Sequence, residues 1–179
     1  MRPPACEIWE NAGNMSALQS FPRITPFLWF DSNAKEAVDF YLTVFRNSRR
    51  LDELRNTGDA PGPKGGILTI AFELDGQLFT ALNGGPNFKF AEAVSFVVRC
   101  HTQDEIDYYW EKLSSGGSEV QCGWLKDKFG LSWKIVPARI HELLKTSKAM
   151  QCPGTSCTRF IAHRVMASRA KEMARRRRR

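Results

Sequence analysis

Apolar and polar residues in the first half of the chain follow two different periods. An apolar run at residues 24–30 suits a strand, and the segment after it spaces apolar residues as on one face of a helix. Between them stands Asn33, with Glu36 three residues later, the pair expected of a helix N-cap and its reciprocal acid. The predicted helix stripe consists of Ala37, Val38, Tyr41, Val44 and Phe45. This segment therefore predicts a strand followed by a capped amphipathic helix.

The same order of features returns in the second half of the chain. An apolar run at residues 94–98 leads to Thr102, and Glu105 follows at the spacing of a capping box. A second helix stripe follows, made of Ile106, Tyr109, Trp110 and Leu113. The chain is therefore predicted to be duplicated, and two half-units packed together enclose a cleft in which small molecules bind.

Strand patterns fill the rest of each half. In the first half, Asp75-Gly76 suits a tight hairpin turn between two of the strands. In the second half, Pro137 ends the last strand, and a short helix is expected to begin within residues 140–144. The predicted strands are residues 49–55, 67–74, 78–82, 119–124 and 131–136. Each half thus consists of a strand, a helix and two or three further strands, which is an α+β fold.

Composition places the chain among globular proteins. Its 179 residues, with 42% hydrophobic content, suit one folded domain, and no apolar run approaches the ~20 residues needed to cross a bilayer. Residues 1–20 lack the basic and apolar regions of a secretory signal. The five cysteines are odd in number and contain no CxxC pair, which favours reduced thiols and a cytoplasmic location.

The formal charge of +7 is concentrated near the C-terminus. Ten basic residues and one acid lie between Ser147 and Arg179, so the part before them is mildly acidic. A nucleic-acid-binding domain carries its positive charge on a folded surface, so we expect no such partner beyond non-specific contact by Arg175 to Arg179. The predicted organisation is an extension (1–22), a folded domain (23–145, with modules of about 23–90 and 91–145) and a basic, disordered tail (146–179).

The cysteines allow two further interpretations. Cys152 and Cys157 lie near His163 in sequence, a partial zinc set that lacks a fourth ligand. Cys122 stands four residues from Lys126, which lowers the pKa of a thiol where the two side chains meet. A tail that happens to contain thiols and a buried, inert thiol are the simpler interpretations.

Several longer strings of the chain carry a resemblance: residues 25–31 (TPFLWFD), 33–41 (NAKEAVDFY), 62–65 (GPKG), 81–90 (ALNGGPNFKF), 108–113 (YYWEKL) and 121–133 (QCGWLKDKFGLSW). They resemble the PhnB-like family of the vicinal oxygen chelate superfamily, which also contains glyoxalase I and the bleomycin resistance proteins. The resemblance runs from about Arg23 to Leu144. The residues before Pro22 and after Lys145 resemble nothing in the family.

The resemblance implies a glyoxalase-like fold: two βαβββ modules whose curled mixed sheets form a shared cleft, commonly in a homodimer. Metal-using members of the superfamily place His, Gln or Glu at cleft-facing positions of the first and last strands of each module. By alignment these positions hold Thr25, Asn83, Ala93 and Lys134. The first three are poor ligands or none, and an ammonium group repels a divalent cation. We therefore expect no bound metal and no other cofactor.

Many proteins of this family are labelled 3-demethylubiquinone 3-methyltransferases. A site for S-adenosylmethionine normally uses a parallel sheet with a Gly-rich turn between its first strand and helix. Here that turn is Asp31-Ser32-Asn33, and the Gly-rich stretches at residues 58–66 and 83–86 have no helix behind them. Methyl transfer, or metal-dependent isomerase, lyase or dioxygenase chemistry, is therefore the alternative, and whether the protein is an enzyme stays open.

Strand alternation indicates which residues would line the cleft. It places Thr25, Phe27 and Trp29 on the face away from the helix, and Leu28 and Phe30 toward it. Aromatic surface, neutral hydrogen-bonding groups and one cation suit a small aromatic or anionic molecule. Core packing explains the aromatic residues equally well, and residues 83–86 equally suit a plain turn. The predicted ligand-binding set is Thr25, Phe27, Trp29, Asn83, Ser95, Trp124, Ser132 and Lys134, and no catalytic residue is assigned.

Overall fold

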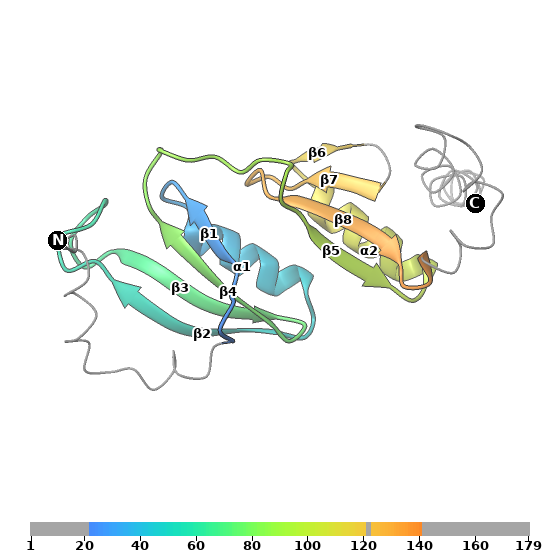
Figure 1. Cartoon of the computed structure of the whole chain (residues 1–179), viewed down its shortest axis with the longest axis horizontal. Coiled ribbons are helices and arrows are strands. Elements are labelled where there is room, and N and C mark those ends of the chain that lie inside the picture. Colours follow the sequence, from blue (N-terminus) through green and yellow to red (C-terminus); the bar gives the residue numbers. More distant parts are fainter. Residues whose placement is uncertain (1–21, 121–122, 141–179) are drawn as a thin grey trace, which may run out of the picture. The chain divides into compact units, whose positions relative to one another are not determined.

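The structure is a computed structural model that describes residues 22–120 and 123–140. The chain divides between Lys89 and Phe90 into two compact units, which we call module 1 and module 2. Figure 1 shows that both modules repeat the order strand, helix and three strands. Among the helices of the described ranges, none is long and apolar enough to span a membrane.

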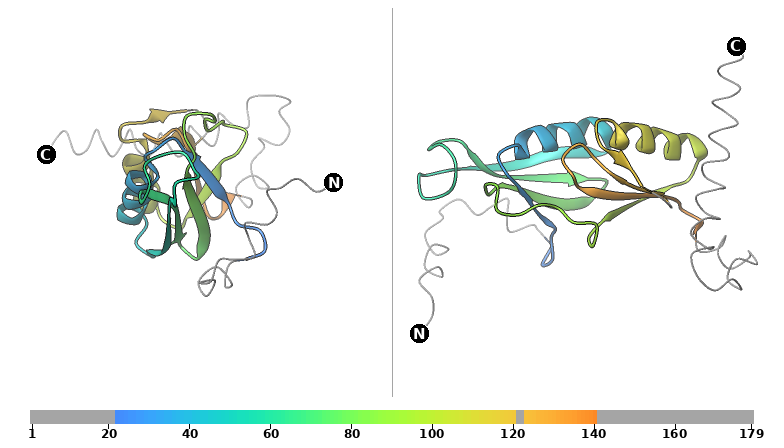
Figure 2. Two further views of the ribbon diagram at one scale, coloured as in Figure 1. Left: turned by 90° about the vertical axis from the view of Figure 1, so that its left-hand side faces the viewer. Right: turned by 90° about the horizontal axis from the view of Figure 1, so that it is seen from above.

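Module 1 is a four-stranded mixed sheet with one helix on one of its faces (Figures 1 and 2). Its elements are β1 (Phe27–Phe30), α1 (Ala34–Val44), β2 (Ser48–Arg55), β3 (Ile67–Leu74) and β4 (Gln77–Asn83). The strand order is β1-β4-β3-β2, with β1 parallel to β4 and the other pairs antiparallel. The predicted tight turn is confirmed, since Asp75 and Gly76 both have positive φ, 48° and 82°, as such a hairpin requires.

The core of module 1 lies between α1 and the sheet. All five residues of the predicted helix stripe are buried, and Leu28 and Phe30 face the helix as strand alternation predicts. Tyr41 of α1 stacks on Phe72 of β3, with ring centroids 6.3 Å apart, and Phe72 stacks on Phe79 of β4 at 5.3 Å. We call the side of each sheet that carries the helix the helix face, and the other side the helix-free face.

Module 2 repeats this architecture with shorter strands. Its elements are β5 (Phe96–Cys100), α2 (Gln103–Ser114), β6 (Ser118–Glu119), β7 (Trp124–Lys126) and β8 (Ser132–Pro137), in the order β5-β8-β7-β6. Ile106, Trp110 and Leu113 are buried, while Tyr109 is half-buried. The α+β fold with two βαβββ modules is thus confirmed, and the mixed sheets, each with one parallel pair, remain open.

The turn before β8 is organised by a buried carboxylate. Asp127 is 2% exposed, and its Oδ1 accepts hydrogen bonds from the backbone amides of Phe129 and Leu131. Its Oδ2 accepts a hydrogen bond from Trp133 Nε1 at 2.8 Å. These bonds satisfy the buried charge and fix the start of β8, the strand that carries two of the predicted ligand-binding residues.

The first predicted helix cap is confirmed in its position but not in its hydrogen bond, and the second is confirmed in both. Asn33 occupies the N-cap position of α1, but its side chain makes no capping hydrogen bond. Asn83 takes that role, because its Oδ1 accepts a hydrogen bond from the Ala34 amide at 2.9 Å. At α2, the Thr102 side chain and the Glu105 side chain form the complete capping box. A residue distant in sequence therefore replaces the local cap in module 1.

The predicted strand at residues 119–124 is wrong, because the chain reverses there. Its two ends belong to β6 and β7, which pair antiparallel, and the Val120 amide donates to the Trp124 carbonyl at 2.9 Å. Gly123 has φ of 83°, a left-handed conformation that breaks a strand. The strand β5 begins two residues after the predicted start at residue 94. Apart from Ile140, the helix predicted within residues 140–144 lies outside the described residues, and so does the tail.

Candidate functional site

The predicted aromatic residues of module 1, Phe27 and Trp29, lie on its helix-free face. The Phe27 side chain is largely exposed, whereas the Trp29 side chain is bonded to its own module. Phe27 is 59% exposed on β1, and its neighbour across the sheet is Thr80. Trp29 is tied to the end of β4: its Nε1 donates to the Gly85 carbonyl at 2.9 Å. A Cβ added at Gly84 would lie only 2.3 Å from its ring, so the indole packs directly on that glycine. The indole of Trp29 is thus held by module 1 itself.

The other two predicted residues of module 1 are engaged in local structure. Thr25 Oγ1 donates a hydrogen bond to the Pro22 carbonyl at 3.0 Å. Asn83 pairs with buried Phe30 and therefore lies on the helix face, opposite to Phe27 and Trp29. Its Oδ1 caps α1, and its Nδ2 donates to the Ile67 carbonyl at 2.9 Å. The side-chain amide of Asn83 therefore joins α1 to the start of β3.

A hollow of about 450 Å³ lies beside Asn83 at the edge of module 1. Its lining comes from the β1–α1 turn, the β2–β3 loop and the residues after β4: Asp31, Ser32, Lys35, Asn56, Pro61, Gly62, Pro63, Gly66, Ile67, Asn83, Gly85 and Pro86. Buried Asn56 holds the loop, since its Nδ2 donates to three loop carbonyls and its Oδ1 accepts from two loop amides. Sequence reasoning noted this loop as a Gly-rich stretch and as part of the family resemblance, but did not assign it to a site.

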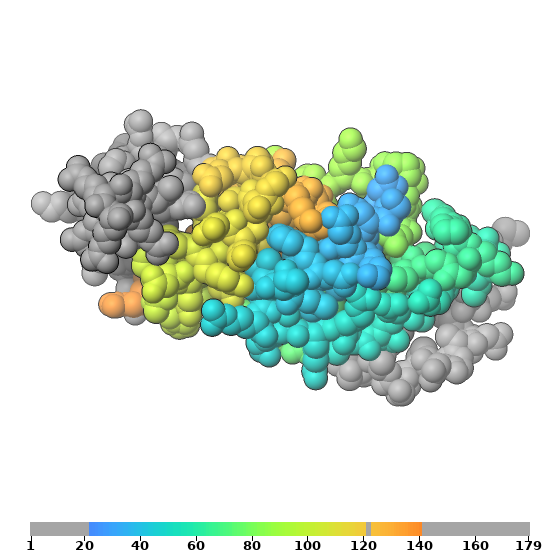
Figure 3. Space-filling view, turned by 180° about the vertical axis from the view of Figure 1, so that it is seen from behind, coloured from blue at the N-terminus to red at the C-terminus, as the bar shows by residue number. Residues whose placement is uncertain are grey.

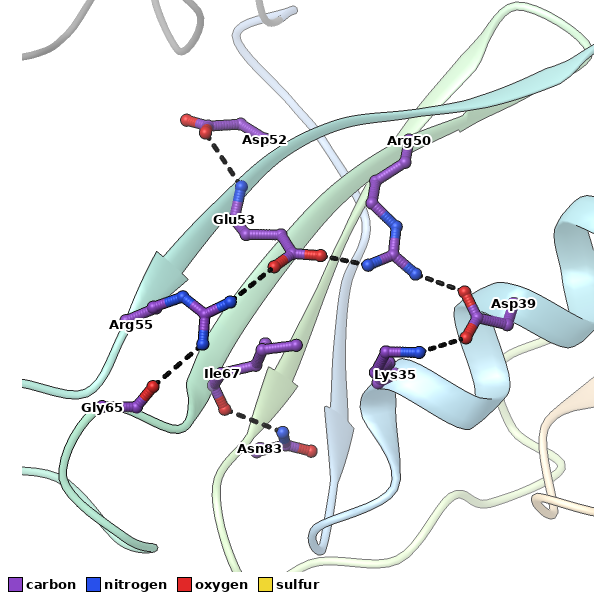
Figure 4. A network of polar contacts seen from close by, with 9 residues as sticks. All are labelled: Lys35, Asp39, Arg50, Asp52, Glu53, Arg55, Gly65, Ile67 and Asn83. Carbon is purple, nitrogen blue, oxygen red and sulfur yellow. Dashed lines mark hydrogen bonds and ion pairs between the residues drawn. The ribbon is translucent and has the colours of Figure 1, made fainter.

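A chain of charged side chains runs along one edge of module 1 and ends at the same loop (Figure 4). Arg50 of β2 bridges Asp39 of α1 and Glu53 of β2. Lys35 also binds Asp39 at 2.7 Å, and this hydrogen bond, together with Arg50, holds the pKa of the Asp39 carboxyl below its usual value. Arg55 contacts Glu53 and donates to the Gly65 carbonyl at 3.0 Å. All of these ion pairs are at least partly exposed, so each contributes little to stability.

Module 2 brings three of its four predicted residues together on the helix-free face. Trp124 of β7 lies directly opposite Lys134 of β8, and the Lys134 ammonium is 5.4 Å from the centre of the Trp124 ring. Ser132 lies two residues before Lys134 on the same face, and its cross-strand partner is Lys126. Ser95 is half-buried one residue before β5. Ligand binding by this set, and the cleft that the sequence predicts between the modules, stay predictions.

Two further cations of this face were missed by sequence reasoning. Lys126 forms an ion pair with Glu92, and its hydrogen bond lowers the pKa of the Glu92 carboxyl. Arg99 of β5 is exposed, and strand alternation from Val97 places it on the helix-free face. The same alternation rule, applied to β5 and β7, would have found both residues in the sequence.

The positions that hold metal ligands in related proteins do not fit a metal ion here. Thr25 and Asn83 are used in the hydrogen bonds described above, and exposed Ala93 offers no donor atom. Lys134 contributes a positive charge. Within residues 22–120 and 123–140, no group of three or more His, Cys, Asp or Glu residues is arranged to hold a metal ion.

No activated thiol is found in the described part of module 2. Cys100 is 1% exposed, and burial raises the pKa of its thiol to about 12, so the thiol is protonated and unreactive at neutral pH. His101 is exposed just before α2. The pairing of Cys122 with Lys126, and the set of Cys152, Cys157 and His163, involve residues outside the described ranges.

Comparison with known proteins identifies one matching family and solved structures that share the fold. The family model described as 3-demethylubiquinone-9 3-methyltransferase matches residues 22–136. A PhnB protein from Bacillus cereus is similar at 34% identity and a TM-score of 0.57, over 64% of this chain and 98% of its own. Protein PA1353 from Pseudomonas aeruginosa, at 21% identity and a TM-score of 0.51 over 64% of this chain and 96% of its own, shares the fold. No protein of curated function matches the chain.

Proposed function

Since the chain belongs to the 3-demethylubiquinone-9 3-methyltransferase family, as a PhnB-like member of the glyoxalase and bleomycin resistance superfamily, we propose that it binds a small aromatic or anionic molecule without a metal ion. One observation carries the proposal. On the helix-free face of module 2, Lys134 lies over the Trp124 ring and has no carboxylate partner in the described ranges. A flat apolar ring beside an unneutralised ammonium suits such a ligand.

The predicted ligand-binding residues of module 1 support placing the ligand on module 2, because their polar groups are already bonded. The indole of Trp29 already donates its hydrogen to Gly85, and both ends of the Asn83 amide are bonded within the module. Side chains that are already engaged gain less from a ligand than side chains that lack a partner. The polar groups with binding capacity therefore lie mainly in module 2.

Tryptophan fluorescence tests the proposal on the purified full chain. We expect saturable changes with members of a panel of aromatic and anionic metabolites, without added metal. Trp124→Phe should keep the fold, checked by circular dichroism, and lose most of the response. Native mass spectrometry of the same preparation checks for a molecule that co-purifies. If no panel compound gives a saturable response and nothing co-purifies, the proposal is wrong.

Methyl transfer is the second candidate, because the matching family is described by that activity. The turn between β1 and α1 contains no glycine, and only one strand pair of each sheet is parallel. The usual phosphate- and nucleoside-binding turn is therefore missing from residues 22–120 and 123–140. Calorimetric titration with S-adenosylmethionine tests this candidate, and elemental analysis tests metal-dependent chemistry. Saturable binding of S-adenosylmethionine, or a stoichiometric metal, would favour an enzyme.

We also propose a homodimer, as the family resemblance implies. Light scattering of the full chain over a range of concentrations measures the mass directly. A monomeric mass at all concentrations would contradict this proposal without affecting ligand binding.

A further inference from the structure

We propose that the ligand is an organic anion and that Ser132 and Lys134 hold its negatively charged group. This inference rests on the proposed function and names the ligand class. Its first support is the Ser132 hydroxyl, which is buried, with the residue 1% exposed, and has no hydrogen-bond partner in the part of the chain that the structure describes. Leaving such a group unpaired costs free energy, so buried hydroxyls nearly always have a partner.

The strand register places this hydroxyl within a compact polar patch. Ser132 is paired with Lys126 across β7 and β8, and Lys134 is paired with Trp124. Directly opposed residues of antiparallel strands have Cβ atoms about 4.5–5.5 Å apart, and all four side chains lie on the helix-free face. We call these four residues the β7–β8 patch. One charged group of a small molecule is within reach of both Ser132 and Lys134.

The charges around the β7–β8 patch favour an anion. The ammonium of Lys126 is balanced by Glu92, whereas Lys134 lies over the ring of Trp124. Arg99 adds another cation on the neighbouring strand β5, so among the described residues of this face three cations meet one carboxylate. A carboxylate or phosphonate accepts hydrogen bonds from both the hydroxyl and the ammonium, and such charge-assisted bonds are about twice as strong as neutral ones.

The surroundings of the patch also indicate the rest of the ligand. Val97 of β5 is 50% exposed and pairs with Lys134, while Trp124 flanks Lys134 on the other side. These two side chains offer apolar surface to the body of a molecule whose charged end binds Ser132 and Lys134. Access to the hydroxyl requires neighbouring side chains to move, and the lysine stems are the most flexible in the patch.

The test compares an anion with its neutral isostere on the full chain. Benzoate and phenylphosphonate are the anionic probes, and benzamide is the neutral one; calorimetry measures their affinities. We expect at least one anion to bind about tenfold or more tightly than benzamide, because hydrogen bonds to charged groups are worth about 1.5–3 kcal/mol. Lys134→Met should remove this preference, while Lys112→Met, the same change at an exposed position of α2, should leave it intact.

Ser132→Ala gives a readout that a purely structural role would not. It removes a hydroxyl that lacks a partner in the free protein, so the variant should be as stable as the wild type or more stable. Its affinity for the anion should nevertheless fall about five- to tenfold, with binding of benzamide unchanged. Unchanged anion affinity in this variant would overturn the assignment of Ser132.

The two proposals fail in different ways. Equal binding of benzoate, phenylphosphonate and benzamide would overturn the anion inference and leave small-molecule binding in place. Binding of benzamide alone would do the same. A lack of binding by all three probes overturns the anion inference, and the proposed function also fails if the wider metabolite panel gives no response.

Discussion

The two modules share one topology but use their polar side chains differently. In module 1, the Asn83 amide and the Trp29 indole are both bonded within the module. In module 2, Ser132 and Lys134 have no hydrogen-bond or ion-pair partner in the described ranges. Duplication therefore preserves the apolar helix face, which each module needs for its core, while the helix-free faces differ. The proposed ligand site rests on this difference and not on the repeat itself.

The loops differ as well. The β2–β3 loop of module 1 spans eleven residues, 56–66, and forms the hollow beside Asn83, whereas β6 and β7 of module 2 are joined by residues 120–123. Figure 3 shows the modules from behind, where residues of β2 and β3 extend along module 1. The Asn56 side chain makes five hydrogen bonds to backbone groups of this loop. Backbone groups beside the hollow are therefore already bonded, and the loop is held in place.

The largest losses of stability are expected in the apolar cores under the two helices, which both modules share. Tyr41→Ala in module 1 and Trp110→Ala in module 2 each remove a buried aromatic side chain from the helix face, and each should lower the free energy of unfolding by about 3–5 kcal/mol. Urea unfolding of the full chain, followed by circular dichroism, measures both losses. A loss below about 1 kcal/mol in either variant would show that the two helix faces are not equivalent cores.

Substitutions at the helix N-caps should lower the free energy of unfolding less than these core substitutions, and by different amounts in the two modules. Asn83→Ala removes a distant cap and leaves the Ala34 amide and the Ile67 carbonyl unpaired, so we expect a loss of about 1–3 kcal/mol. Thr102→Ala removes a local cap and should cost about 1 kcal/mol. Urea unfolding measures both, with Thr102→Ser as the control that keeps the capping oxygen. A larger loss in Thr102→Ala than in Asn83→Ala would reverse the comparison.

Alkaline pH should lower the free energy of unfolding through the thiol of Cys100, a residue of module 2. Burial raises the pKa of this thiol from 9.0 to about 12, so the native state keeps the proton while the unfolded state releases it above pH 9. Stability from this group is therefore full below pH 9 and falls by about 1.4 kcal/mol per pH unit between pH 9 and 12. Comparing the wild type with Cys100→Ala at pH 8 and pH 10 isolates the effect, because other titrating groups are common to both. A pH-independent difference would contradict it.

The smallest effect is expected at the surface of module 1. Lys35→Met removes an exposed i,i+4 ion pair and should change stability by less than about 0.5 kcal/mol. The pKa of the Asp39 carboxyl should rise toward 3.8, while Arg50 still lowers it. The lowered pKa means that this carboxylate stabilises the fold above pH 3.8 and loses its contribution as the pH falls through the folded pKa. An NMR titration of Asp39 checks the direction, with Lys112→Met as control.

The candidate site was only partly predictable. The sequence proposed Trp124, Ser132 and Lys134 as cleft residues, and alternation within one strand explains why Ser132 and Lys134 share a face. That Trp124 joins them depends on the register in which β7 pairs with β8. Asn83 was proposed in the same way, but the register of β4 with β1 puts it on the helix face. The strand predicted at residues 119–124 failed for a related reason, because the turn at Gly123 separates two strands that pair with each other.

Features that depend on local spacing follow from the amino-acid pattern alone: the two helix stripes, the capping box at Thr102 and the Asp75-Gly76 turn. Each is encoded within one or two turns of chain, so no distant contact is needed to form it. The folded arrangement is needed to see that Asn83 caps α1 and that Lys134 lies over Trp124, beside a Ser132 hydroxyl without a partner in the described residues. The cap joins residues 49 positions apart in the chain, and the contact of Lys134 with Trp124 depends on the register in which β7 and β8 pair.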